Sequence, residues 1–99
     1  MDKIIVQCDP DLKDLIPGYI NNRNKDVIVM RECLDISDFA KIRTIGHSMK
    51  GSGGGYGFDT ITDLGEKIEN AALADDTDKI DQVIQELEFY ISRVEVVYS

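Results

Sequence analysis

Apolar residues along this chain recur every three or four positions, which is the spacing of one face of an α-helix. Short polar stretches interrupt the pattern at 35–38 and 74–77, and they carry the Asp, Ser and Thr residues that cap helices. The pattern therefore predicts successive helices joined by short connectors. The first helix follows Asp9 or Asp11 and reaches about Leu34, and the second spans roughly 38–56. The third begins at Asp59 or Thr60, and the fourth carries an apolar stripe from Ile80 to Tyr98.

Glycine, proline and polar residues refine where these helices begin, break and end. Pro17-Gly18 predicts a break or kink near residue 16, because proline lacks the N–H that a helix interior uses. Gly57 is well placed to end the second helix as a left-handed residue. Thr60 and Asp63 match a capping box for the helix that follows.

The opening residues, 1–10, contain a short β-prone run from Ile4 to Cys8. This run is too short for a sheet of its own, so we expect it to lie extended along the body of the protein, and nothing in the pattern predicts a sheet. Residues 11–99 are expected to form one helical domain. We therefore predict an all-α protein, an antiparallel four-helix-type bundle with an additional N-terminal helix or extended segment.

Composition argues against several kinds of partner and site. The net charge of −8 disfavours nucleic acid, and the apolar runs are far too short to span a membrane. The first residues lack a basic leader followed by an apolar stretch, so we expect a cytoplasmic protein. Cys8 and Cys33 have neither metal nor redox spacing, and buried structural thiols are the expected role.

Glycine is concentrated in the helix predicted over 38–56. A glycine inside a helix costs about 0.5–1 kcal/mol relative to alanine, so either this segment is a loop or something approaches its backbone closely. An apolar stripe continues through the glycines, which favours a helix. The stripe comprises Ile42, Ile45, Met49, Ser52 or Gly53, and Tyr56. Gly65 in the next helix would likewise allow close packing against a neighbour.

The chain's single histidine, His47, lies on another face of this helix. A helical wheel places Lys50, Gly51 and Gly54 with it, about 150° from the apolar stripe. Arg43 lies beside them, as a surface charge or a docking contact. A solvent-facing imidazole is a nucleophile that can accept a phosphoryl group, and a lysine one turn away can stabilise that group. The two glycines leave the adjacent surface bare for a partner.

The stretch His47-x-Met49-Lys50-Gly51-Ser52-Gly53-x-x-Tyr56-Gly57-Phe58 resembles the motif of histidine-containing phosphotransfer (HPt) domains. The resemblance extends over about 11–98. It implies a four-helix-type bundle that is phosphorylated on the histidine ring and exchanges phosphate with aspartates of response-regulator receiver domains. It also implies a sensor or hybrid histidine kinase upstream in a two-component phosphorelay. By motif position His47 would be the phosphoacceptor, Lys50 the phosphate-stabilising cation and Gly51 the clearance residue.

The sequence offers little support for an enzyme. The glycines form neither a dinucleotide fingerprint nor a P-loop, and one histidine with two scattered cysteines is too few ligands for zinc. A histidine-kinase core would need a nucleotide-binding domain for which no length remains. We therefore expect a phosphocarrier without kinase or ATPase activity, with no cofactor or metal of its own and with Mg²⁺ on the partner receiver. The alternative is a helical adaptor that binds a signalling partner without being phosphorylated.

Overall fold

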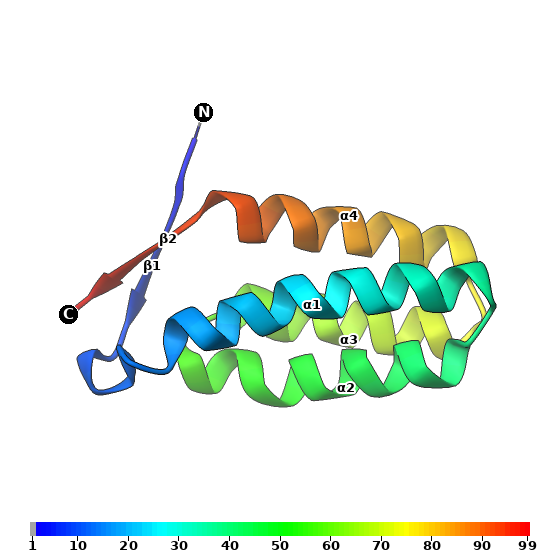
Figure 1. The fold of residues 1–99 in the computed structure, drawn as a ribbon, viewed down its shortest axis with the longest axis horizontal. Coiled ribbons are helices and arrows are strands. Elements are labelled where there is room, and N and C mark those ends of the chain that lie inside the picture. Colours follow the sequence, from blue (N-terminus) through cyan, green and yellow to red (C-terminus); the bar gives the residue numbers. More distant parts are fainter. Residues whose placement is uncertain (1) are drawn as a thin grey trace.

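Four helices lie lengthwise beside one another in the computed structural model, which describes residues 2–99 (Figure 1). They are α1 (Ile16–Asp35), α2 (Phe39–Tyr56), α3 (Asp59–Leu73) and α4 (Thr77–Arg93). Connectors of only two or three residues join them, so each helix runs antiparallel to the one before it. The all-α bundle expected from the apolar spacing is confirmed. No helix in this part of the chain has both the length and the apolar character needed to cross a membrane.

Capping residues fix the ends of α2, as the sequence predicts. The Asp38 carboxylate accepts a hydrogen bond from the backbone N–H of Lys41, with N and Oδ1 3.1 Å apart. Gly57 ends the helix in the left-handed region at φ 99°. The capping box predicted at Thr60 is wrong. The turn at Gly57 leads directly into α3, whose N-cap is Phe58 without a side-chain cap, so Thr60 already lies inside the helix.

The predicted break near residue 16 is where α1 begins. A short 3-10 turn, Pro10–Leu12, precedes it, and the Asp9 carboxylate accepts a hydrogen bond from the backbone N–H of Asp11. Pro17 then occupies the first turn of α1, where its missing N–H has no intrahelical partner to lose. The proline therefore starts this helix rather than kinking it.

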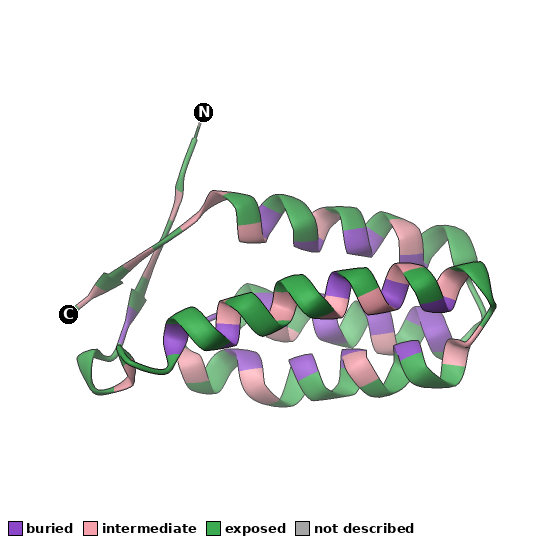
Figure 2. Ribbon diagram, in the orientation of Figure 1, coloured by how far each residue is buried: buried purple, intermediate pink, exposed green. Residues whose placement is uncertain are grey.

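Each helix turns one apolar stripe inward, and the stripes meet in a single core (Figure 2). Its largest fully buried side chains are Phe58, Ile16, Met30, Ile42, Met49, Ile61, Ile68, Ile80, Ile84, Leu87 and Val83. Cys8 and Cys33 are buried free thiols, as expected, and burial raises the pKa of both. An aromatic stack adds support where α2 is richest in glycine. The ring of Tyr19 on α1 stacks on Tyr56 with centroids 4.2 Å apart.

Glycines bring the backbones of α2 and α3 into direct contact. A Cβ added at Gly65 would lie 2.5 Å from the backbone N of Lys50 and 2.7 Å from the backbone O of Gly46. A Cβ at Gly46 would lie 2.9 Å from the backbone O of Gly65, and one at Gly53 would lie 2.6 Å from the backbone N of Thr62. Real side chains do not fit at such distances, so these positions require glycine. The close packing predicted for Gly65 is confirmed.

Two strands at one end of the bundle depart from the sequence prediction. β1 (Ile4–Cys8) and β2 (Val94–Tyr98) pair in parallel, with Ile4 opposite Val94 and Cys8 opposite Tyr98 (Figure 1). The expectation of no sheet, and of a last helix that continues to Tyr98, is therefore wrong. Alternate residues of β2 are half-buried against the bundle, which satisfies the apolar spacing as well as a helix would. The β-branched run there favours the strand.

Candidate functional site

His47 stands on the surface of α2, near the middle of that helix. Its side chain is 73% exposed, whereas Ile42 and Met49 on the opposite stripe are fully buried. The helix follows the predicted course through the glycines, and this course turns the ring toward solvent. An exposed ring on a rigid helix is accessible to a second protein, which a core histidine would not be.

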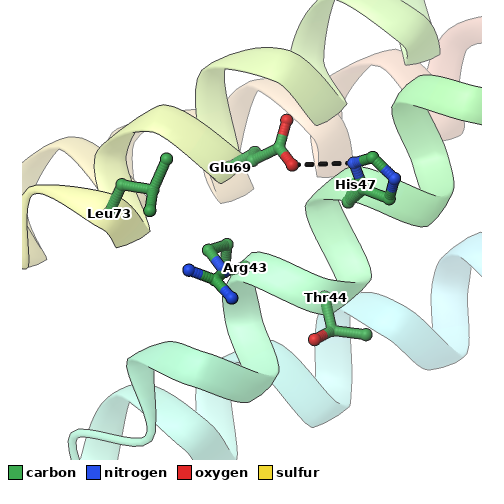
Figure 3. A pocket seen from close by; sticks show the side chains of 5 residues that line it. All are labelled: Arg43, Thr44, His47, Glu69 and Leu73. Carbon is green, nitrogen blue, oxygen red and sulfur yellow. Dashed lines mark hydrogen bonds and ion pairs between the residues drawn. The ribbon is translucent and has the colours of Figure 1, made fainter.

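Glu69, from α3, fixes the orientation of the His47 ring (Figure 3). Its Oε2 lies 2.8 Å from Nδ1 of the imidazole, and its side chain is only 18% exposed. A carboxylate can only accept a hydrogen bond, so Nδ1 carries the hydrogen and donates the bond to Glu69. The lone pair of the neutral ring is then on Nε2, which lies on the side of the ring away from Glu69 (Figure 3).

The same carboxylate holds the ammonium group of Lys50. The Lys50 Nζ lies 3.7 Å from Oε1 of Glu69 and 4.0 Å from Oε1 of Glu66, also on α3. The two oxygens of Glu69 thus serve two different groups of α2. The sequence alone does not indicate a role for Glu69, because its position opposite His47 depends on how α2 and α3 align.

The glycines of α2 divide between two tasks. From the sequence, the free-energy cost of glycines in this helix is explained by the close approach of a partner protein. In the structure, Gly46 and Gly53 instead face α3 and allow close packing within the bundle. Gly51 differs from them, since a Cβ there would meet nothing within 4 Å, and its role as the clearance residue for a partner stays a prediction. Gly54 is intermediate between the packed glycines and the open Gly51. A Cβ there would contact Asp59 at 3.4 Å, and its backbone N–H donates to Oγ1 of Thr62 at 2.8 Å.

A shallow groove adjoins His47 on the Glu69 side (Figure 3). Its lining residues are Arg43, Thr44, His47, Glu69 and Leu73. Arg43 is exposed, as predicted, one helical turn before His47. Among residues 2–99, the His, Cys, Asp and Glu side chains form no group of three that could hold a metal ion.

Comparison with known protein families assigns the chain to one of them. A family model described as the Hpt domain matches residues 12–94, nearly the whole chain, and the protein belongs to the Hpt domain family. At the level of the family, Hpt domains are phosphocarrier modules of two-component phosphorelays that transfer phosphate through histidine. No curated protein and no solved structure matched the chain significantly. Strand β1 and all but the first residue of β2 lie outside the matched range.

Proposed function

We propose that this protein carries a phosphoryl group on Nε2 of His47. The observation that carries the proposal is the Nδ1–Glu69 hydrogen bond on an exposed ring, because it leaves one nucleophilic nitrogen and directs it outward. The donor and acceptor are aspartates of response-regulator receiver domains, with a sensor or hybrid histidine kinase at the head of the relay. The chain itself supplies no kinase or ATPase activity in this scheme.

Transfer from an aspartyl phosphate to His47 is a single in-line displacement. The Nε2 lone pair forms the P–N bond while the P–O bond to the aspartate breaks, and the aspartate departs as a carboxylate. No proton has to leave the ring, because Nδ1 keeps its hydrogen. The phosphorylated ring is then cationic, and the Glu69 carboxylate at 2.8 Å offsets that charge. The reverse reaction passes the group to the next aspartate by the same path.

Lys50 and Gly51 act on the phosphoryl group and on its access. The Lys50 ammonium lies between two carboxylates of α3 at ion-pair distances, and the arriving phosphoryl oxygens compete for it as stronger anionic acceptors. Gly51 leaves space beside the ring for the partner's active-site loops. Gly54 extends this open surface toward α3. The Mg²⁺ that the chemistry requires belongs to the receiver domain in this proposal.

Labelling with a phosphorylated receiver domain tests the proposal. We expect incubation with such a receiver and Mg²⁺ to place acid-labile, base-stable phosphate on His47, and ³¹P NMR to report the Nε2 isomer. The His47→Gln variant should take up no label. Equal labelling of that variant would exclude this site. Binding of the receiver without any label on the wild type would favour the adaptor function instead.

A further inference from the structure

The groove beside His47 is built from matching positions on two antiparallel helices. Arg43 and His47 lie one turn apart on α2, and Glu69 and Leu73 lie one turn apart on α3 (Figure 3). His47 and Glu69 close one end through their hydrogen bond. Arg43 and Leu73 therefore form the other end. An adjoining hollow continues from these two residues, with Phe39, Ala40, Ala72 and Asp75 completing its lining.

Of the residues that line this groove, Arg43 and Leu73 have side chains that are free to contact another molecule. The Arg43 guanidinium makes no hydrogen bond and no ion pair with any residue of the described range 2–99, whereas the Lys50 ammonium is held by two carboxylates. The hydroxyl of Thr44 already donates to the backbone O of Ala40 at 3.1 Å. Leu73 is 60% exposed, so much of its apolar surface is in water.

The phosphoryl group does not attach on the groove side of the His47 ring. Nδ1 faces the groove and is occupied by Glu69, while Nε2 lies on the opposite side of the ring (Figure 3). A phosphoryl group placed in the groove would also meet the Glu69 carboxylate at close range and be repelled. The reacting nitrogen and the groove therefore lie on opposite sides of the imidazole ring (Figure 3).

We infer that the groove is a docking subsite for the receiver domain, separate from the reaction side and resting on the proposed function. It fits a surface element with an apolar side chain over Leu73 and a carboxylate against Arg43. The groove is continuous with the reacting site, and a protein whose aspartate reaches Nε2 must cover the surface immediately around the ring. The unpaired guanidinium of Arg43 supplies the charge complement for the carboxylate.

Single-turnover transfer from a receiver that labels wild-type His47 tests this subsite, with the rate measured at increasing receiver concentration and KM taken as the half-saturating concentration. We expect Leu73→Ser and Arg43→Ala each to raise KM for the phosphorylated receiver by roughly five- to tenfold. The rate at saturating receiver should stay unchanged, because neither residue touches the reacting atoms. Added salt should raise KM more for the wild type than for Arg43→Ala, because only the wild type can form the ion pair between Arg43 and the receiver's carboxylate. Circular dichroism and the melting temperature verify that each variant folds.

Two matched controls make the result specific to the groove. Ile28→Ser removes an equally exposed apolar side chain on α1, at 60% exposure, and Lys25→Ala removes an exposed cation of the same helix. Both should keep the wild-type KM. Unchanged KM in both groove variants, or an equal rise in the controls, would overturn the docking subsite while wild-type labelling still supports the carrier. Absence of label on wild-type His47 would instead overturn the carrier proposal, and the docking subsite with it.

Discussion

The imidazole of His47 on α2 and the carboxylate of Glu69 on α3 are joined by a hydrogen bond of 2.8 Å from Nδ1 to Oε2. This contact links neighbouring helices and decides which ring nitrogen carries the proton. In the proposed function it also supplies a negative charge beside a ring that becomes cationic on phosphorylation. Glu69 is thus a positioning residue that acts through His47.

Replacing Glu69 separates its two effects. Glu69→Gln keeps an oxygen acceptor for Nδ1–H but removes the charge, and Glu69→Ala removes both. We expect single-turnover transfer to slow roughly 10- to 100-fold in Glu69→Ala, the equivalent of losing a charge-assisted hydrogen bond, and less in Glu69→Gln. Long-range ¹H–¹⁵N NMR of the neutral ring should show Nδ1–H in the wild type and Glu69→Gln, and both tautomers in Glu69→Ala. A single unchanged tautomer in Glu69→Ala would contradict the assigned role.

Removing the Lys50 ammonium should slow transfer without weakening docking. We expect Lys50→Ala to lower the single-turnover rate about tenfold, because the phosphoryl oxygens lose a charge-assisted contact. Lys67→Ala is the matched control, since the Lys67 ammonium pairs with Glu86 at 3.9 Å, away from His47. Rates for Lys50→Ala equal to those of Lys67→Ala would remove Lys50 from the site.

Two glycine-to-alanine substitutions should change stability in opposite directions. Gly65→Ala places a Cβ 2.5 Å from the backbone N of Lys50, so α2 and α3 must separate. We expect the free energy of unfolding to fall by about 1–3 kcal/mol. Gly51→Ala meets nothing within 4 Å inside a helix, and it should gain about 0.5–1 kcal/mol. Urea denaturation measures both, and equal effects of the two substitutions would contradict the backbone contact.

Because its two thiols are buried, the protein should become less stable in alkali. Burial raises the pKa of Cys8 and of Cys33, so above the unfolded thiol pKa of about 8.5 the folded state holds more protons than the unfolded state. Stability should therefore fall as the pH rises from 7.5 to about 9.5. The urea midpoint measures this, and the Cys8→Ala/Cys33→Ala double variant should lose most of the slope. An unchanged slope in that variant would assign the pH dependence to other groups.

The course of α2 could be predicted because its apolar stripe is local in sequence. Met49 and Ile42 set one face, which determines the opposite one on which His47 is exposed. Gly57 marked the helix end for an equally local reason, since only glycine adopts its left-handed backbone without strain. These features depend on the spacing within one segment.

Features that depend on contacts distant in sequence could not be predicted in the same way. Glu69 meets His47 only because Gly46 and Gly65 set the alignment of two helices. Val94–Tyr98 becomes a strand because Ile4–Cys8 lies beside it and pairs with it in parallel. Its apolar residues fit a helix or a strand when read alone, so the spacing did not decide between them.

The backbone contact between α2 and α3 has a consequence for repeated phosphate exchange. Where Gly46 meets Gly65, no side chain separates the two main chains, so no rotamer change can alter the distance between the helices that bear the imidazole and its carboxylate. Under the proposed function, each aspartate that delivers or accepts a phosphoryl group then meets the same preformed arrangement. A carrier built in this way reorganises little between accepting and releasing a phosphoryl group, which suits transfer in both directions.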